Sequence, residues 1–465
     1  MLMGVKRVTN LNAIILAAGK GTRMKSAYPK VLHKILGRPM LQYVVESAKQ
    51  AGAGSILVVV GFEGEQVVQS LGPDFHYVWQ REQLGTGHAV LMAEPILKGM
   101  DGDLLVLYGD TPLLEPETVQ NLVEVKRNQK AVAAILTTQL NDPTGYGRII
   151  RNSQGNIVGI VEDKDASPEQ KAIKEVNTGV YCFEIQSLLK ALSVLSPRNA
   201  QGEYYLTDVF KIFVDQNLPV TGMLTHQAEQ VMGPNDRIQL AATEDYLKMK
   251  INQALMKQGV TISDPRFTYI DPQVEVGQDS QILPGTFILG NTKIGEGCII
   301  GPHTIIIDSI IENNTEIVFS QINGARIGPH NSVGPFANIR PGTVTDSQVK
   351  IGDFVEVKNS QVGIGSKVPH LIYLGDAEVG KNVNIGAGTI TCNYDGVHKH
   401  HTHIKDGAFI GCNVNLVAPV TVGADATVGA GSTITKEVPD KTLGIARSRQ
   451  ENISKWGTLR KGPDK

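Results

Sequence analysis

The 465-residue sequence has few of the features that would assign it at once to a specialised class of protein. Its four cysteines stand singly, without a CxxC pair or zinc-like spacing, so a disulfide framework is excluded and a reducing cytoplasm is favoured. It has no apolar run of about 18 residues and no signal-peptide pattern, so neither membrane spanning nor export is expected. The formal net charge of -2 lacks the basic excess typical of nucleic-acid binding. We therefore expect a cytoplasmic globular protein without nucleic-acid or membrane partners, in which any anion site is local.

The length predicts at least two domains, because 465 residues exceed what one hydrophobic core usually organises. Over residues 10–236, short β-branched runs such as 56–60 and 104–107 alternate with segments of helical period. This pattern is typical of an α/β domain, with a Rossmann-like parallel sheet covered by helices. Residues 237–260 place aliphatic side chains on one helical face before Gly259, which predicts a linker helix.

Beyond this linker the sequence repeats every six residues. Such a hexad places one aliphatic side chain inward per short strand, and three strands form a triangular coil that stacks into a parallel β-helix. We expect a left-handed β-helix over residues 261–440 and a C-terminal arm over residues 441–465. Breaks in phase near residues 307–321 and 394–403 predict irregular coils or inserted loops. The repeating inward positions are Val276, Ile282, Ile288, Ile294, Ile300, Ile306, Ile327, Val333, Ile339, Ile404, Ile410, Leu416, Val422, Val428 and Ile434.

A glycine-rich, basic loop follows the first predicted strand, residues 13–16. Gly19 and Gly21 would let backbone N–H groups approach phosphates, and Arg23 and Lys30 would add fixed positive charge. The spacing is neither the GxxxxGK[ST] of a P-loop nor GxGxxG. Taken alone, the glycine loop is weak evidence and favours a structural turn.

Two later segments fit the same sheet edge. The second glycine loop, QREQLGTG at residues 80–87, suits a pyrimidine base held by amide and backbone groups. Asp110 ends the apolar run 104–107, and one carboxylate, an amide oxygen and substrate phosphates can hold a hard divalent ion. Asp110 is also a common turn residue before Thr111-Pro112, so both interpretations stay open.

The motifs together resemble a known family. LAAGKGTRM, with Pro29-Lys30 after it, is similar to the L-x(2)-G-x-G-T-R-[LM]…P-K element of sugar-1-phosphate nucleotidyltransferases. NDPTGYGR, GIVE, EVNTG and QGEYYLTD follow in order, and SKVPHLIYLGD at residues 366–376 resembles the SKxxHLxYLGD stretch of an acetyltransferase. From about residue 12 to 450 the chain resembles the bacterial bifunctional UDP-N-acetylglucosamine pyrophosphorylase and glucosamine-1-phosphate N-acetyltransferase.

For the N-terminal domain, the resemblance implies condensation of UTP with N-acetylglucosamine-1-phosphate and release of pyrophosphate. Arg23 and Lys30 would act on the phosphates, and Asp110 and Asn235 would bind Mg²⁺, although Asn235 lies in GPNDR where relatives more often read GVNDR. The residues expected to hold the nucleotide are Leu16, Ala17, Ala18, Gly19, Gln80, Gly85, Thr86 and Tyr108. Those expected to hold the amino sugar are Gly147, Glu162 and Asn177.

For the C-terminal domain, the resemblance implies acetyl transfer from acetyl-CoA to glucosamine-1-phosphate, with His370 as the base. A histidine can take the proton of the attacking ammonium near neutral pH. The sugar phosphate would meet Arg340, Lys358, Tyr373, Asn384 and Lys399, and the coenzyme would meet Ala387, Asn393, Tyr394, Cys412, Ala430 and Arg447. Relatives form homotrimers with shared acetyltransferase sites, and the arm that contains Trp456 would cover a neighbouring coenzyme site.

Two residues depart from the family pattern. Pro369 precedes the expected base where small residues are usual, and Cys412 stands where some relatives have serine. The run from His398 to His403 invites a metal interpretation, but without a carboxylate or cysteine to close the site we interpret it as a solvated loop.

Two alternatives remain from the sequence. The chain could be a nucleotidyltransferase with a regulatory β-helix, as in ADP-glucose synthesis, although regulation would not require Lys358 or the SKVPHLIYLGD stretch. It could also be a non-catalytic exchange-factor or scaffold subunit, although the retained Arg23, Lys30 and Asp110 argue against that.

Overall fold

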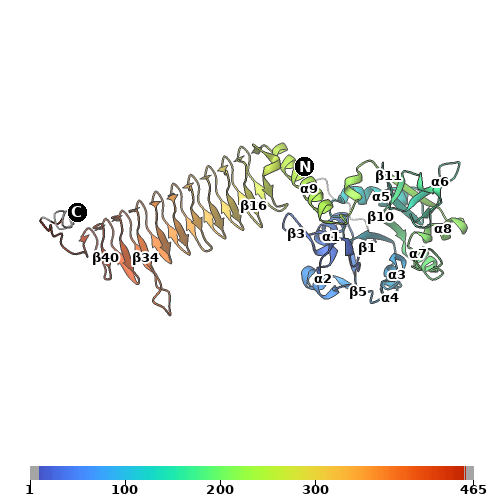
Figure 1. The fold of residues 1–465 in the computed structure, drawn as a ribbon, viewed down its shortest axis with the longest axis horizontal. Coiled ribbons are helices and arrows are strands. Elements are labelled where there is room, and N and C mark those ends of the chain that lie inside the picture. Colours follow the sequence, from blue (N-terminus) through green and yellow to red (C-terminus); the bar gives the residue numbers. More distant parts are fainter. Residues whose placement is uncertain (1–9, 455, 457–465) are drawn as a thin grey trace, which may run out of the picture. The chain divides into compact units, whose positions relative to one another are not determined.

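The computed structural model describes residues 10–454 and residue 456. The chain divides into two compact units between Leu247 and Lys248, inside helix α9 (Arg237–Lys257). Figure 1 draws the first unit from blue to green and the second from yellow-green to red. Each unit has its own hydrophobic core and is described separately.

The N-terminal unit is built on a twisted sheet in the order β11-β7-β10-β6-β1-β4-β5. The strands are β1 (Leu11–Ala17), β4 (Ser55–Val60), β5 (His76–Trp79), β6 (Asp103–Tyr108), β7 (Ala133–Gln139), β10 (Glu175–Glu184) and β11 (Val220–Thr225). A hairpin of β8 (Arg148–Arg151) and β9 (Ile157–Val161) joins it through β10, and β2 (Lys34–Ile35) pairs with β3 (Arg38–Pro39).

The α/β class is confirmed, but the expectation of a parallel sheet is wrong for two strands. β10 runs antiparallel to both β6 and β7, and β9 runs antiparallel to β8 and so in the direction of β10. The chain reaches β10 from the β8–β9 hairpin, so it needs no long crossover and returns beside β7 in the opposite direction.

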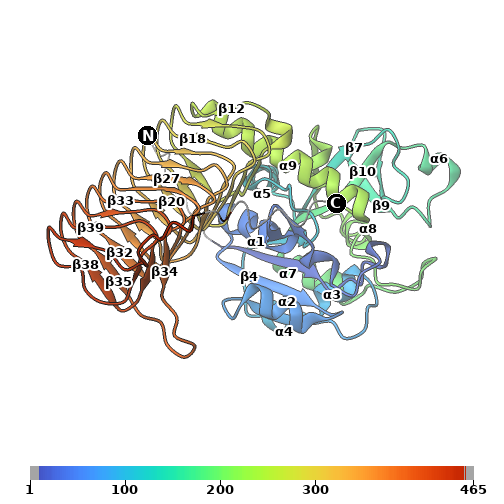
Figure 2. The same cartoon turned by 60° about the vertical axis from the view of Figure 1, so that its left-hand side comes forward.

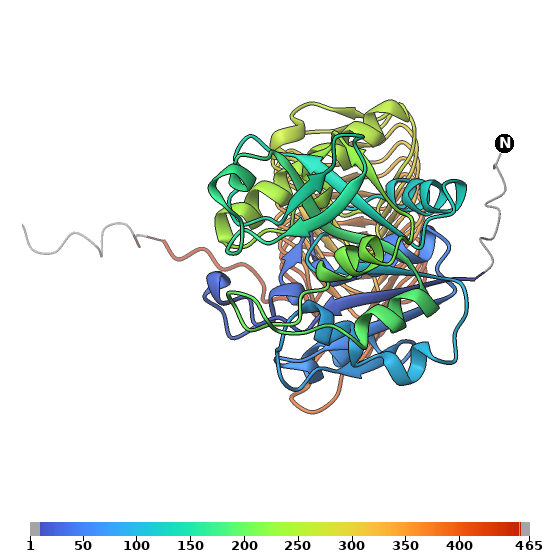
Figure 3. The same cartoon turned by 90° about the vertical axis from the view of Figure 1, so that its right-hand side faces the viewer.

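Helices cover both faces of this sheet (Figure 3). Alternate side chains of β1 enter opposite cores: Ile14 packs with one set of helices and Ile15 with the other. Burial on both faces explains why these strands read as continuous apolar runs. One face is covered by α1 (Met40–Gln50), α2 (Gly64–Leu71) and α5 (Pro116–Asn128), and the other by α3 (Thr86–Leu91), α4 (Glu94–Leu97), α7 (Ile185–Leu192) and α8 (Asp208–Asp215). The short helices are α6 (Pro168–Lys171) and the 3-10 turns η1 (Thr22–Met24), η2 (Lys30–Leu32) and η3 (Ala228–Val231).

The C-terminal unit is a parallel β-helix whose coils are visible as a stack in Figures 1 and 2. After η4 (Pro265–Phe267), its strands form three sheets, one on each side of the coil. The first holds β12 (Thr261–Ile262), β15 (Gln281–Ile282), β18 (Ile299–Ile300), β21 (Glu316–Ile317), β24 (Ser332–Val333), β27 (Lys350–Asp353), β30 (Lys367–His370), β33 (Asn384–Ile385), β36 (Phe409–Ile410), β39 (Thr427–Val428) and β41 (Leu443–Gly444). The second holds β13 (Tyr269–Ile270), β16 (Phe287–Leu289), β19 (Ile305–Ile307), β22 (Gln321–Asn323), β25 (Asn338–Ile339), β28 (Glu356–Lys358), β31 (Tyr373–Gly375), β34 (Ile390–Cys392), β37 (Asn415–Val417) and β40 (Thr433–Ile434). The third holds β14 (Glu275–Val276), β17 (Lys293–Ile294), β20 (Ile310–Ile311), β23 (Arg326–Ile327), β26 (Val344–Thr345), β29 (Gln361–Val362), β32 (Ala377–Val379), β35 (Thr402–Ile404) and β38 (Val420–Val422).

The six-residue repeat corresponds to the inward side chains of this β-helix. Ile300 pairs with Ile317 in the next coil and Ile317 with Val333, and all three are buried. Each buried aliphatic side chain contributes roughly 1.5–3 kcal/mol, so the stacked column is a large part of the core energy.

The two breaks in phase have different causes. In the first, the inward residues Ile306 and Ile311 stand five apart instead of six, so the coils are shortened and no loop is inserted. In the second, a loop between β34 and β35 projects from the stack, drawn in orange in Figure 2. The predicted arm begins within the coils, because β41 pairs with β39. Trp456 is exposed, whereas residues 455 and 457–465 of that arm lie outside the described residues.

Candidate active sites

The loops that follow β1, β5 and β6 meet at one edge of the N-terminal sheet and line a cleft of about 410 Å³. Ligands of open α/β sheets bind at the carboxyl ends of parallel strands, which is this edge. The cleft contains every residue predicted to meet the nucleotide and its phosphates: Leu16, Ala17, Ala18, Gly19, Arg23, Lys30, Gln80, Gly85, Thr86, Tyr108, Asp110 and Asn235. It also contains Gln83 and Glu203, which sequence reasoning did not select although both lie in motifs that it used.

The second glycine loop is shaped by close backbone packing. Gly85 has a φ of +108°, and a Cβ at this position would lie 2.6 Å from the carbonyl oxygen of Tyr204. The buried side chain of Gln80 donates a hydrogen bond to the Gly85 carbonyl at 3.0 Å, which closes the loop. Only glycine fits here, because a side chain would clash with backbone and disfavour the left-handed conformation.

Cationic and oxygen-bearing side chains converge beside this loop. Lys30 Nζ lies 2.5 Å from Asp110 Oδ2 and 2.9 Å from Asn235 Oδ1, and Arg23 Nη2 donates to the same Asn235 oxygen at 2.9 Å. The segment that carries Asn235 approaches closely, because a Cβ on Gly233 would lie 2.6 Å from the Asp110 carbonyl oxygen. Both Asp110 and Asn235 present side-chain oxygens here, which are the type of ligand that a small hard metal ion takes.

A second cavity of about 310 Å³ adjoins the first. Both cavities are lined by Arg23, Tyr108, Asp110 and Asn235, so these four residues form a common wall. The second cavity contains all three residues predicted for the amino sugar, Gly147, Glu162 and Asn177. Sequence reasoning missed Thr144, Tyr146 and Thr178, although each belongs to a quoted motif.

Burial sets the ionisation of two residues at this second cavity. Burial, with Asp208 and Asp165 nearby, raises the pKa of Glu162, although the hydroxyl of Thr207 donates to Glu162 Oε1 at 2.9 Å. Burial and the Glu162 charge also raise the pKa of Tyr108, so its hydroxyl stays protonated and can donate. The cavity therefore offers both a hydrogen-bond acceptor and a donor to a hydroxylated or amidated ligand.

In the β-helix, the expected base and three expected coenzyme residues lie at one corner of successive coils. Backbone N–H groups of Leu371, Gly388, Asn413 and Gly431 donate in turn to the carbonyls of Asp353, His370, Ala387 and Cys412. The column therefore runs Asp353, His370, Ala387, Cys412 and Ala430, and neighbouring coils stand about 4.8 Å apart. A long ligand could follow this corner from the histidine outward.

Asp353, which sequence reasoning missed, contacts His370 directly. Asp353 Oδ1 lies within hydrogen-bond distance of His370 Nδ1, and this hydrogen bond lowers the pKa of Asp353. A carboxylate that accepts the Nδ1 proton leaves Nε2 with its lone pair, which is the state required of a base. The preceding Pro369 is accommodated within β30, which pairs with β27 as far as the His370 and Asp353 positions.

Basic side chains lie on the adjoining second sheet. Lys358 and Tyr373 come from neighbouring strands, β28 and β31, and Arg340 follows β25, where its Nη1 contacts Glu356 Oε1 at 2.7 Å. Lys399, from the projecting loop, approaches Lys358, whose contact and charge lower the pKa of Lys399. Two lysines held together in this way favour a bound anion.

The remaining predicted residues are less closely grouped. Asn384 lies on β33 of the first sheet, opposite Lys367. Arg447 Nη1 donates to the Ala430 carbonyl at 2.9 Å and so extends the corner column. Asn393 is buried and donates to Asp376, whereas the exposed Tyr394 donates to Gly396 within its own loop.

Two histidines of the run from His398 to His403 pair with carboxylates that precede the run in the sequence. His400 Nε2 is 2.7 Å from Asp395 Oδ2, and His403 Nδ1 is 3.1 Å from Glu378 Oε2. Each of these carboxylates therefore pairs with a single histidine of the run. Over residues 10–454, however, no three histidine, cysteine, aspartate or glutamate side chains form a metal-binding group. Within the same described range, none of the helices has the length and apolar character needed to span a bilayer.

Comparison with known proteins extends these observations. Family models match for a MobA-like NTP transferase domain at residues 13–158, a GMPPB C-terminal domain at residues 265–367, and bacterial transferase hexapeptide repeats at residues 401–436. The bifunctional protein GlmU of Halalkalibacterium halodurans is 50% identical over 451 residues, which cover 97% of this chain and 99% of that protein. The same-named proteins of Geobacillus sp. and Carboxydothermus hydrogenoformans are each 52% identical, over 95% of this chain and 96% and 99% of their own lengths.

The fold and the two groups of residues define a two-domain transferase, with a nucleotidyltransferase domain joined to a hexapeptide-repeat domain. At this identity over nearly the whole length, the chain belongs to the family of the bifunctional protein GlmU. It is a bifunctional enzyme of UDP-N-acetylglucosamine synthesis, with uridylyltransferase and acetyltransferase activities.

Proposed function

We propose that the N-terminal cleft binds UTP and that the adjoining cavity binds N-acetylglucosamine-1-phosphate. The supporting observation is the wall shared by the two cavities, formed by Arg23, Tyr108, Asp110 and Asn235. A sugar phosphate in one cavity and a nucleotide in the other would meet at this wall. There an oxygen of the sugar phosphate attacks the α-phosphorus of UTP, a new P–O bond forms, and pyrophosphate leaves.

The chain's own contribution to this reaction is alignment and charge neutralisation. Two phosphate groups repel one another, and Arg23 and Lys30 supply positive charge where they meet. The attacking phosphate oxygen is already ionised at neutral pH, so no general base is needed. The bond from the α-phosphorus to the bridging oxygen breaks, and that oxygen leaves with its negative charge as part of pyrophosphate.

We propose Asp110 and Asn235 as the protein ligands of Mg²⁺. Their side-chain oxygens already converge on one positive group, the Lys30 ammonium, and both are hard donors. The remaining ligand positions would be taken by phosphate oxygens and water. When bound, the ion would neutralise phosphate charge, and Lys30 would turn toward the nucleotide.

We propose that the β-helix transfers an acetyl group from acetyl-CoA to glucosamine-1-phosphate. His370 Nε2 removes a proton from the sugar ammonium, and the neutral nitrogen attacks the thioester carbon. The C–S bond then breaks, the nitrogen loses its second proton to become an amide, and the coenzyme thiolate takes up this proton and leaves as a free thiol. Asp353 orients the imidazole, and Lys358, Arg340, Tyr373, Asn384 and Lys399 are assigned to the sugar phosphate. The corner column with Ala387, Cys412, Ala430 and Arg447, together with Asn393 and Tyr394 of the loop, is assigned to the coenzyme.

We propose that the working assembly is a homotrimer in the cytoplasm. One supporting feature is a column of exposed rings at one corner of the β-helix, Phe319, Phe336 and Phe354, with successive centroids 5.8 and 5.4 Å apart. A contiguous exposed apolar strip is typical of a surface covered by another chain. The His370 side chain is 56% exposed in one chain. A second chain packed against this corner of the β-helix would cover it.

The N-terminal half of this proposal is tested with Lys30→Ala. Because Lys30 supplies charge at the reacting phosphates, pyrophosphate release should fall by roughly a hundredfold or more. Lys34→Ala, a change of an exposed lysine outside both cavities, serves as the matched control and should retain wild-type turnover. Thiol release from acetyl-CoA with glucosamine-1-phosphate, measured on the same samples, should be unchanged. Wild-type pyrophosphate release by Lys30→Ala would remove Lys30 from the mechanism.

A further inference from the structure

The β8–β9 hairpin forms one side of the amino-sugar cavity. Gly147 immediately precedes β8 and Glu162 immediately follows β9, so the open end of the hairpin carries two of the cavity's residues. Backbone pairing between the hairpin and the main sheet, among the residues described, is confined to Arg148 of β8 and Val176 of β10. The position of the hairpin therefore depends strongly on side-chain contacts.

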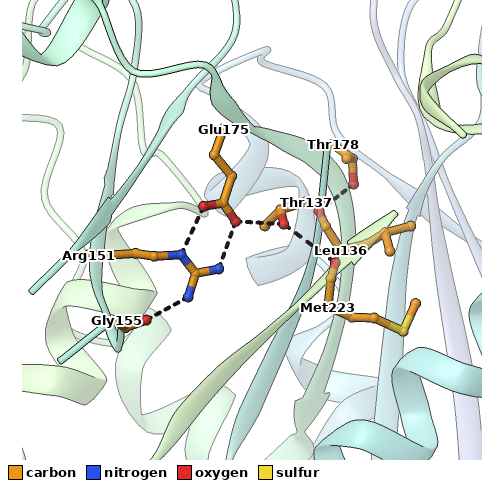
Figure 4. A network of polar contacts seen from close by, with 7 residues as sticks. All are labelled: Leu136, Thr137, Arg151, Gly155, Glu175, Thr178 and Met223. Atoms are coloured by element: carbon orange, nitrogen blue, oxygen red, sulfur yellow. Dashed lines mark hydrogen bonds and ion pairs between the residues drawn. The ribbon is translucent and has the colours of Figure 1, made fainter. Parts of the chain in front are cut away.

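One such contact is a charged network at the far end of the hairpin (Figure 4). Arg151 Nε and Nη2 donate to the two carboxylate oxygens of Glu175 at 2.8 and 2.7 Å, and Arg151 Nη1 donates to the Gly155 carbonyl at 2.8 Å. Thr137 of β7 donates to Glu175 Oε1 at 2.8 Å. Burial alone would raise the pKa of Glu175, but the hydrogen bonds from Arg151 and Thr137 lower it overall. The network thus ties the hairpin and its turn to β10 and β7.

The same strand, β10, holds the other end of the hairpin. Asn177 stands two residues after Glu175, and its backbone N–H donates to the Gly147 carbonyl at 2.8 Å. The Glu175 carboxylate and the Asn177 backbone therefore hold the hairpin at two points of β10. Because Asn177 and Glu162 line the cavity from β10 and from the hairpin, a shift of the hairpin changes the space between them.

We propose that Arg151 and Glu175 are positioning residues for the amino sugar. Neither lines the nucleotide cleft or the amino-sugar cavity, so they act through the hairpin and not by contact with substrate. The planar guanidinium matches the carboxylate with two parallel hydrogen bonds, which fixes direction as well as distance. This inference rests on the proposed amino-sugar subsite and deepens it by assigning residues that set its width.

The test compares Arg151→Lys, Glu175→Gln and the double variant Arg151→Lys/Glu175→Gln in steady-state uridylyl transfer. Displacement of the β8–β9 hairpin should raise KM for N-acetylglucosamine-1-phosphate by about tenfold or more, while KM for UTP changes by less than about twofold. The double variant should resemble the single variants, because the bridge is already lost in each. Lys211→Ala, which breaks the exposed Lys211–Asp215 pair of α8, is the matched control and should leave both KM values unchanged.

Thermal unfolding and thiol release from acetyl-CoA report on folding of each preparation. The assignment is overturned if correctly folded variants keep the wild-type KM for the sugar phosphate, or if both KM values rise equally. Failure of the wild type to saturate with N-acetylglucosamine-1-phosphate would instead overturn the proposed subsite, and this assignment with it. Glu175→Gln preserves side-chain volume but leaves one acceptor oxygen in place of two, so it breaks the paired hydrogen bonds with Arg151 and provides a folded variant if Arg151→Lys is unstable.

Discussion

At the scale of single residues, the amino-sugar cavity depends on side chains whose ionisation is set by burial. Glu162 is a half-buried carboxylate with further acids close by, and one hydrogen bond, from Thr207, offsets only part of that cost. Tyr108 packs so closely against Gly179 that a Cβ there would lie 1.9 Å from its ring. A half-buried carboxylate acceptor and a hydroxyl donor thus face one cavity, and ionisation of the carboxylate costs free energy in the folded state.

Glu162→Gln tests this cost. The pKa of Glu162 is raised in the folded state, so above that pKa the folded protein bears an ionisation penalty that the unfolded chain does not. Glutamine keeps the acceptor for Thr207 and removes the charge. We expect the variant to be at least as stable as wild type at neutral pH, with the difference narrowing as pH falls toward the ordinary glutamate pKa of about 4.3. The measurement is the thermal midpoint of both proteins against pH, and a pH-independent loss of stability in the variant would contradict the account.

At the scale of elements, residues are brought together by the ends of parallel strands and by the stacking of coils. The glycine loops after β1 and β5 were predictable because strand ends of one sheet share an edge. The inward positions of the coils were predictable from their period of six. The Asp353–His370 pair was not selected, because neighbours in a β-helix stand one coil apart, here 17 residues, and no local pattern marks them. The antiparallel direction of β10 and the Arg151–Glu175 bridge depend on hairpin register, which composition does not reveal.

Gly352→Ala tests how coil spacing supports the acetyltransferase site. A Cβ on Gly352 would lie 1.8 Å from the carbonyl oxygen of Pro369, so β27 and β30 must separate to accommodate it. The Asp353–His370 contact lies at the next position of both strands and should be disturbed. We expect thiol release to fall by about a hundredfold while pyrophosphate release stays at the wild-type level.

Gln361→Ala, at an exposed position of β29, is the control for this change and should retain both activities. Full acetyl transfer by Gly352→Ala would show that the coil spacing does not govern the histidine's placement.

At the scale of the whole molecule, two units with separate cores carry separate chemistry. The N-terminal unit has the cleft and adjoining cavity, and the C-terminal unit has the corner column and the lysine pair. The two reactions are consecutive, since the acetylated sugar phosphate made by one site is the substrate of the other. Family membership was predictable because motifs of both halves occur in order, whereas the geometry within each site required the fold.

The most direct test of two separate sites is to mix two inactive variants. Lys30→Ala should retain acetyl transfer. His370→Ala should retain uridylyl transfer, but its rate of acetyl transfer should fall by roughly a hundredfold to ten-thousandfold. Each alone should form almost no UDP-N-acetylglucosamine from glucosamine-1-phosphate, acetyl-CoA and UTP. The mixture should form it at a rate near that of wild type, because the acetylated intermediate made by one variant is used by the other. Rapid product formation by His370→Ala alone, or none by the mixture, would contradict the account.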